Sequence, residues 1–321
     1  MVGGAEPLGA GPMIHTMSEG GKPSYALVTA AYNEEKFIQR TIESIIAQTV
    51  PPQKWIIVSD GSTDRTDEIV ETYARQYGFV ELYRITEEHA RNFTAQVNAI
   101  NAGFVRLRGS GWDFIGNLDS DITLDPDYFE KLLERFSKDP GLGVAGGFIY
   151  EEEEGSFISR RSNSIDSVAH GVQLFRRECL EALRGYTPFS WGGSDSHAVV
   201  RARMNGWRAE SVPELKAFHH RPTGGGFGGL RYQYKGGQMD FYLGTHPVFE
   251  MFRMARRFRS KPYVIGPIAR LAGFAWGYVS GQRRQASPEF IRFFRAEQMN
   301  KLRALWTGRS TTPRMSKRSE P

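Results

Sequence analysis

Short apolar runs alternate with amphipathic stretches between residues 24 and 150. The runs are rich in valine, isoleucine, leucine and aromatic residues, which is typical of buried strands. Strands that alternate with helices form βαβ units, so the pattern predicts an α/β fold with a mainly parallel sheet flanked by helices. The strands expected are residues 25–29, 55–59, 80–84, 112–118 and 142–150.

The stretches between these strands repeat apolar residues at helical spacing. Ile38, Ile42 and Ile45 form the first set, and Asn33 ahead of them is expected to cap that helix. An N-cap at Asn33 would place the first turn of the helix directly after the first strand. The later sets are Ile69, Val70 and Tyr73, then Val97, Ile100 and Phe104, and then Phe129, Leu132, Leu133 and Phe136.

After residue 150 the rhythm changes. An acidic run at 151–154 leads into a polar loop, and a strand-like segment follows at 172–175. Residues 193–205 have helical spacing, and 207–212 alternate as a strand does. Residues 222–237 are dense in glycine, which predicts a loop. The same polypeptide is therefore expected to continue as one domain.

We expect that domain to cover residues 23–246. Residues 247–306 are basic and rich in aromatic residues, which predicts a separate region of amphipathic helices. Residues 1–22 lack the cationic and apolar segments of a signal peptide and are expected to form a flexible leader. Residues 307–321 are expected to be a disordered tail.

The charge is distributed unevenly along the 321 residues. The whole chain carries +5, but residues 251–321 hold 16 Lys and Arg against 3 Asp and Glu, so this section carries +13 and the first 250 residues carry −8. A nucleic-acid-binding protein would show a groove-reading motif and a broader basic surface, so that class is excluded. The basic section predicts contact with an anionic surface at one end only.

The single cysteine, Cys179, excludes an internal disulfide and a zinc site built from cysteines. It suits a reducing compartment, and we expect a cytoplasmic protein.

Polar side chains follow three of the expected strands, in residues 29–35, 59–64 and 117–121. Ligands of open parallel sheets bind outside the carboxyl ends of the strands. Each segment alone could be a turn with a helix cap, but three at one edge predict a site. Asp119 and Asp121 in the third segment are hard oxygen ligands that suit Mg²⁺ or Mn²⁺ on a diphosphate.

These segments, in this order, resemble the family 2 glycosyltransferases, inverting enzymes with the GT-A fold, a Rossmann-like sheet. The resemblance covers about residues 25–220 and rests on A-Y-N-E-E, V-S-D-G-S-T-D, L-D-S-D and the later G-G-S-D. It implies a nucleotide-diphosphosugar donor held by residues 23–150 and an acceptor held by 151–246. Ala31 replaces the usual proline and Ile122 an aspartate that often follows the motif, and neither change removes a needed carboxylate.

The resemblance also implies the roles of individual residues. Asp119 and Asp121 match the metal-binding motif. Asp195 matches the catalytic carboxylate, although Ser194 stands where a glutamate is usual, so the single remaining acid must be the base. A helix N-cap is the alternative reading of Asp195. The donor-binding positions are Thr29, Ala31, Tyr32, Glu34, Asp60, Arg91, Asp119 and Ser120.

Two neighbouring histidines follow the later strand. A neutral imidazole can complete a metal shell, and an arginine such as Arg221 can hold a phosphate. The resemblance favours His219 over His220 as the third metal ligand. A structural histidine is an equal alternative for either residue alone.

The function expected is metal-dependent, inverting transfer of a sugar from a nucleotide-diphosphosugar, expected to be a UDP-sugar, to a hydroxyl of a glycan or lipid-linked glycan in cell-surface polysaccharide synthesis. One alternative is a non-catalytic glycan- or membrane-binding protein on the same fold, which the intact acids disfavour. Another is a sugar nucleotidylyltransferase. Such an enzyme would carry a G-x-G-T-R turn after the first strand, and its absence from this sequence disfavours that alternative.

The basic helical region suggests where the acceptor is found. Its arginines flank aromatic residues, a composition typical of helices on an anionic membrane surface. No run reaches the roughly 18 apolar residues of a spanning helix. We therefore expect peripheral attachment to the inner face of the membrane, with packing against the domain as the alternative.

Overall fold

The computed structural model describes residues 23–86, 93–109, 111–221, 229–257 and 264–307. The chain divides after Gly225 into two compact units. We call residues up to Gly225 the sheet unit and those from Gly226 the helical unit. The division lies before the expected end of the domain at residue 246, so the first helix after the glycine-rich segment belongs with the basic helices.

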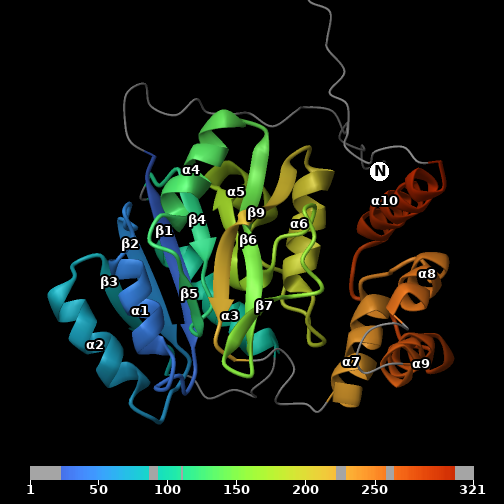
Figure 1. Ribbon diagram of the computed structural model, residues 1–321, viewed down its shortest axis with the longest axis horizontal. Helices are drawn as coiled ribbons and strands as arrows, with labels where there is room; N and C mark the ends of the chain where they lie inside the picture. The colour runs from blue at the N-terminus through green and yellow to red at the C-terminus, as the bar shows by residue number, and fades with distance from the viewer. Residues whose placement is uncertain (1–22, 87–92, 110, 222–228, 258–263, 308–321) are drawn as a thin grey trace, which may run out of the picture. The chain divides into compact units, whose positions relative to one another are not determined.

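The sheet unit contains a nine-stranded sheet with the order β3-β2-β1-β4-β8-β6-β9-β5, and β7 pairs with β6 (Figure 1). Strands β3, β2, β1 and β4 are parallel, as expected. Beyond β4 the sheet is mixed, because β8 runs antiparallel to both β4 and β6. The strands are Tyr25–Ala31 (β1), Lys54–Ser59 (β2), Val80–Arg84 (β3), Phe114–Asn117 (β4), Ile122–Leu124 (β5), Leu142–Glu153 (β6), Ser156–Ser159 (β7), Leu174–Arg176 (β8) and Arg208–His219 (β9).

Helices cover both faces of the sheet because successive strand residues point to opposite faces. Tyr25 and Leu27 pack with α1, α2 and α4 on one face, whereas Ala26 and Val28 pack with α3 and the later helices on the other. The two cores make a three-layer α/β unit, the predicted fold class. The helices are Ile38–Ile46 (α1), Thr66–Gln76 (α2), Phe93–Arg106 (α3), Tyr128–Lys138 (α4), Arg177–Leu183 (α5) and Ser194–Met204 (α6).

Asn33 does not cap α1, contrary to the prediction. The helix begins at Ile38, and Asn33 has a left-handed backbone with φ 54°. Its side-chain oxygen accepts the backbone N–H of Thr63 at 2.8 Å, so the residue ties the loop after β1 to the loop after β2. An asparagine tolerates this conformation and bonds backbone groups in turns, which is why it serves the loop.

The helical unit consists of α7 (Gly229–Tyr242), α8 (Pro247–Arg257), α9 (Ile265–Val279) and α10 (Pro288–Thr307). The prediction of a loop up to residue 237 was wrong from Gly229 onward. The glycines there serve packing: a Cβ on Gly237 would lie 1.9 Å from the carbonyl oxygen of Arg270, and one on Gly273 would lie 2.0 Å from that of Tyr234. They let α7 and α9 touch along their backbones. None of the helices within the described ranges is long and apolar enough to cross a membrane.

Candidate active site

The carboxyl ends of β1, β2 and β4 meet at one edge of the sheet. Asp60, directly after β2, donates its backbone N–H to the carbonyl oxygen of Ala31 at 3.0 Å. Leu118, directly after β4, donates to Val28 of β1, also at 3.0 Å. The three polar segments predicted from the sequence therefore lie together, as the parallel register requires.

Asp119 is held from two sides. Its backbone N–H donates to the carbonyl oxygen of Gly171 at 3.0 Å, and its Oδ1 lies 3.2 Å from Nδ1 of His170. A carboxylate only accepts hydrogen bonds, so Nδ1 of His170 carries the hydrogen. Gly171 has no room for a side chain, since a Cβ there would lie 2.6 Å from Oδ2 of Asp119. The short 3₁₀ helix His170–Val172 thus fixes the first acid of the motif.

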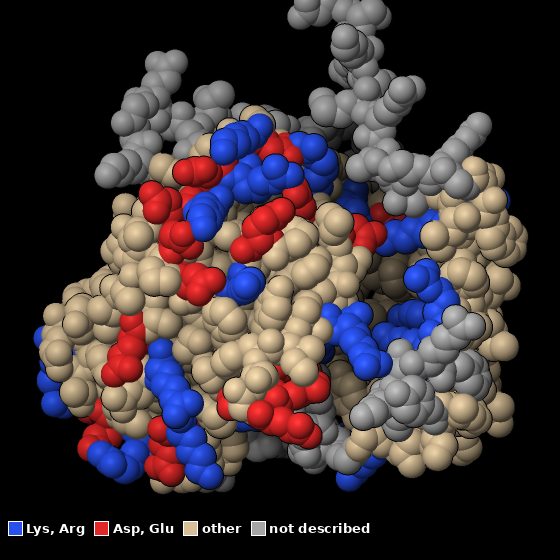
Figure 2. Space-filling view, in the orientation of Figure 1, with Lys and Arg blue, Asp and Glu red and all other residues tan. Residues whose placement is uncertain are grey.

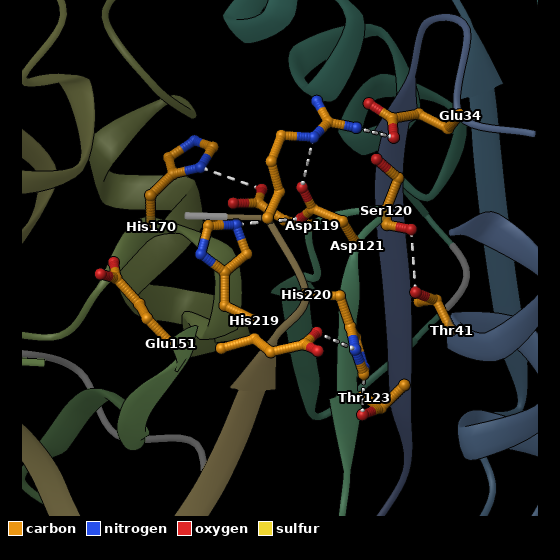
Figure 3. A network of polar contacts seen from close by, with 12 residues as sticks. Glu34, Thr41, Asp119, Ser120, Asp121, Thr123, Glu151, His170, His219 and His220 are labelled. Carbon is orange, nitrogen blue, oxygen red and sulfur yellow. Dashed lines mark hydrogen bonds and ion pairs between the residues drawn. The ribbon is translucent and has the colours of Figure 1, made fainter. Parts of the chain in front are cut away.

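Asp121 meets the end of β9 (Figure 3). The antiparallel pairing of β5 with β9 sets Ile122 opposite His219, which brings Nε2 of His219 within 3.3 Å of Oδ1 of Asp121. Arg221 approaches the other oxygen of Asp121 with Nε at 3.5 Å and forms an ion pair with Glu34. His220 points elsewhere: its Nε2 lies 2.9 Å from the hydroxyl of Thr123.

The electrostatics follow from this crowding. Burial alone raises the pKa of Asp119, but His170 and His219 outweigh it and hold the pKa below its usual value. Burial alone lowers the pKa of His219, and the acids around it raise it instead. Burial also raises the pKa of Glu34 to about 7, against the opposing charge of Arg221. The site is therefore a group of buried acids compensated by histidine and arginine, a setting that accepts a cation or a phosphate.

Asp195 lies in the first turn of α6. The N-cap of α6 is Gly193, with φ 88° and no side-chain cap bond, so the alternative of an N-cap aspartate does not hold. The Asp195 side chain is half-buried. Burial lowers the pKa of His170, and the charges of Asp119 and Asp195 outweigh that effect. The negative charge of Asp195 therefore favours the protonated form of His170.

The predicted donor-binding residues that the structure describes divide into those at or near the sheet edge and Thr29, which lies in the core. Tyr32 is exposed at the edge, whereas Glu34 and Asp60 are largely buried there. Ser120 is buried, and its carbonyl oxygen accepts the hydroxyl of Thr41 at 2.8 Å. Ala31 is also buried. Arg91 lies outside the described residues.

Thr29 is fully buried, and its hydroxyl accepts the indole N–H of Trp55 at 2.9 Å. Its side chain packs in the core rather than at the accessible edge.

The residues present fit a divalent cation only in part. Asp121 and His219 face one point, with a mixed oxygen and nitrogen donor set. In the portion of the chain that the structure describes, no three His, Cys, Asp or Glu side chains are gathered as a complete metal site. Magnesium commonly takes one or two protein carboxylates and completes its shell with substrate phosphates and water, so an incomplete protein shell is compatible with the expected ion.

His170 is the site residue that the sequence analysis did not identify. It stands 51 positions after Asp119 in a segment without a catalytic pattern. The only available signal was the glycine that follows it, because a glycine after a loop marks a close approach of the backbone.

Comparison with known proteins places the site in context. The sequence pattern described as "Glycosyl transferase family 2" matches residues 26–198. The chain is 30% identical over 179 residues to EpsH of Bacillus subtilis (strain 168), covering 50% of this chain and 49% of that one. It is 29% identical over 126 residues to a poly-beta-1,6-N-acetyl-D-glucosamine synthase of Staphylococcus epidermidis, covering 38% and 27%. The chain thus spans half or less of the length of these relatives.

Two solved structures are similar in fold. One is the mannosyltransferase PcManGT from Pyrobaculum calidifontis in complex with GDP-Man and Mn²⁺, with a TM-score of 0.54, 18% identity and coverage of 90% of this chain and 82% of that one. The other is S. aureus TarS 1-349 in complex with UDP-GlcNAc, with a TM-score of 0.50, 14% identity and coverage of 92% and 95%. At these identities the likeness concerns the fold.

Proposed function

The chain belongs to glycosyl transferase family 2 and is a glycosyltransferase, and from this premise we propose a metal-dependent, inverting enzyme. It moves a sugar from a nucleotide-diphosphosugar, UDP-linked by preference, to a hydroxyl of a glycan or lipid-linked glycan in cell-surface polysaccharide synthesis. The observation that carries the proposal is the meeting of Asp121 and His219 at 3.3 Å, beside Asp119, at the sheet edge where Asp60 and Glu34 also lie.

Asp121 and His219 are the proposed metal ligands, with Asp119 beside them. A divalent ion supplies charge that stabilises the leaving diphosphate when it is bound. The mannosyltransferase of similar fold contains Mn²⁺ with its donor, which supports a divalent cofactor, Mg²⁺ or Mn²⁺, here. His219 is preferred over His220 because the latter faces Thr123 and Glu152 instead of the acids of the motif.

Asp195 is the proposed general base. Its carboxylate takes the proton of the acceptor hydroxyl, the hydroxyl oxygen bonds to the anomeric carbon, and the bond from that carbon to the phosphate oxygen breaks. The electron pair leaves with the nucleoside diphosphate. A single displacement of this kind inverts the anomeric centre and needs one base, which agrees with a single acid at this position.

His170 is the proposed positioning residue for Asp119. It bonds Asp119 directly and lies within the field of Asp195. Its ring is also fixed against Tyr186, with the ring centroids 5.5 Å apart. Groups that orient a metal-binding carboxylate in this way commonly set the affinity of the site.

A donor screen tests the proposal. UDP, GDP, dTDP and CMP sugars are each added to the protein with Mn²⁺, and the shift in melting temperature is measured, followed by release of nucleoside diphosphate. We expect a UDP-sugar to give the largest shift and turnover that EDTA abolishes. A shift with another nucleotide would correct the donor, whereas full turnover in EDTA would overturn the role of the metal. Binding without turnover by any donor, with glycan acceptors present, would favour the non-catalytic alternative.

A further inference from the structure

Helix α9 has an inverted distribution of polarity. At 3.6 residues per turn, six of its seven exposed positions fall within an arc of roughly 100° on one face, and the seventh, Tyr278, lies outside that arc. Every residue on that face is apolar, and large side chains are widely exposed, with Ile268 at 53% and Trp276 at 50%. The face consists of Ile265, Ile268, Ala272, Ala275, Trp276 and Val279. We call it the apolar face of α9.

The single charged residue of α9 is buried on the opposite side. The guanidinium of Arg270 donates to Asp240 of α7, with Nε at 2.9 Å and Nη2 at 2.6 Å. Arg253 of α8 lies 2.5 Å from the same carboxylate and also pairs with Glu250. Glu250 is completely buried. The orientation of α9 is therefore fixed by ion pairs and by the glycine contacts with α7, so the apolar face cannot turn inward.

A helix at a water-facing surface normally shows the opposite arrangement, with its polar side outward. Among the described residues, sixteen large hydrophobic side chains are exposed, and eleven of them lie in the helical unit. An exposed apolar face of this kind marks a surface that meets a partner.

The net charge of the helical unit indicates the chemistry of the partner. Residues 226–321 hold 18 Lys and Arg against 5 Asp and Glu, a net charge of +13. Arg256 on α8 and Arg283 after α9 are exposed to solvent. Tyr278 and Trp276 combine an apolar ring with a polar group, as residues at membrane interfaces do. Apolar side chains with basic residues nearby suit an anionic lipid surface.

We propose that the apolar face of α9 docks on the surface of an anionic lipid bilayer, with the helix lying in the interface. Docking would bring the enzyme to a lipid-linked acceptor, and this purpose rests on the proposed function. The docking surface itself depends only on the helical unit.

The test is flotation of the full chain with two kinds of vesicle, one of phosphatidylcholine alone and one an equimolar mixture of phosphatidylcholine and phosphatidylglycerol. The double variant Ile268→Asp/Val279→Asp places carboxylates on the apolar face. Val105→Asp is the matched control, because Val105 is 54% exposed on α3 of the sheet unit. Circular dichroism checks that each variant is folded, and nucleoside diphosphate release from a soluble donor is measured in the same samples.

We expect the unmodified protein and Val105→Asp to float with the anionic vesicles, and the double variant to lose at least tenfold in apparent affinity. Donor turnover should be equal in all three, so a failure of docking and a failure of catalysis are distinguishable. Flotation that is unchanged in the folded double variant, or that fails for every protein, would overturn the proposal. Failure to float together with a dimer that only the double variant disrupts would assign the face to a second copy instead.

Discussion

The sheet unit and the helical unit place their charges in opposite ways. Away from the candidate active site, ion pairs of the sheet unit lie on the outside, as at α4, where Lys131 and Asp127 are 2.5 Å apart and Lys138 and Glu134 are 3.3 Å apart. Figure 2 shows such mixed charges over α4 and α2. In the helical unit the pairs around Asp240 are buried and apolar side chains face outward. The first unit carries −8 and the second +13.

The difference shows that a buried acid in this chain can belong either to a binding site or to a structural ion pair. In the sheet unit, buried acids such as Asp121 lie at the open edge of the sheet, where a bound ligand would supply some of the groups that contact them. In the helical unit, Asp240 is surrounded by Arg253 and Arg270 and lacks nothing that a ligand would supply. Burial of an acid therefore indicates a binding site only where the fold leaves an approach to it.

The largest effect should come from the base. Asp195→Asn should lower kcat by on the order of 10² to 10⁴, the usual contribution of a general base, and leave donor affinity nearly unchanged. Initial rates and calorimetric binding of the donor check this. Asp127→Asn is the control, because Asp127 is a half-buried acid at the N-cap of α4. A rate near that of the unmodified protein would move the base to another residue, and a change in vesicle binding would show that the two units are not independent.

The next largest effect concerns the buried pairs of the helical unit. Asp240→Ala leaves Glu250 as the acid that faces both Arg253 and Arg270, so one buried positive charge loses its partner, and the free energy of unfolding should fall by about 3–5 kcal/mol. Glu134→Ala on the exposed pair of α4 should cost no more than about 1 kcal/mol. Urea denaturation measures both. Equal losses would contradict the distinction between the two kinds of pair.

The same cluster gives a pH dependence. Burial raises the pKa of Asp240, and Arg253 and Arg270 more than reverse this, so the folded pKa lies below the unfolded value of about 3.9. The stabilisation is therefore complete above that value and is lost as the pH falls through the folded pKa. Urea midpoints measured at falling pH should drop below about pH 4 in the unmodified protein and less in Asp240→Ala. Parallel curves would assign the acid sensitivity to other groups.

A smaller effect is expected at His170. His170→Ala should weaken binding of Mn²⁺ with UDP by about 10- to 100-fold, because the orientation of Asp119 is lost. His170→Asn keeps an N–H donor near Asp119 and should recover part of the affinity. His220→Ala is the control, since that ring bonds Thr123. A lower kcat with unchanged KM and no recovery in His170→Asn would contradict the positioning role.

Much of the fold and part of the site could be predicted from the sequence because they depend on local pattern. Apolar runs gave β1 to β4, and the residues following them defined the sheet edge. Asp119 and Asp121 could be predicted as site residues from their spacing and from the apolar strand that precedes them. The strands β5 and β7 were missed because Ile122–Leu124 and Ser156–Ser159 are too short to show periodicity.

Long-range pairing could not be predicted in the same way. The approach of His170 to Asp119 depends on Gly171 and the strand β8, far along the chain. The first part of α7, residues 229–237, was taken for a loop because glycines disfavour helices by about 1 kcal/mol each, and the contact with α9 offsets that cost. The inverted polarity of α9 could be recognised only after Arg270 was seen to be buried with Asp240.

The smallest predicted effect concerns a single basic residue of the helical unit. Arg256→Gln removes one exposed charge from α8, which packs on α9. Each Lys or Arg near an anionic membrane contributes roughly 1 kcal/mol, so affinity for the phosphatidylglycerol vesicles should fall about fivefold. High salt screens this contribution, so the variant and the unmodified protein should then bind equally. Arg108→Gln on the acidic sheet unit is the control and should leave flotation unchanged at either salt concentration. An equal loss in both variants would mean that net charge alone, rather than the position of the charge near α9, determines binding.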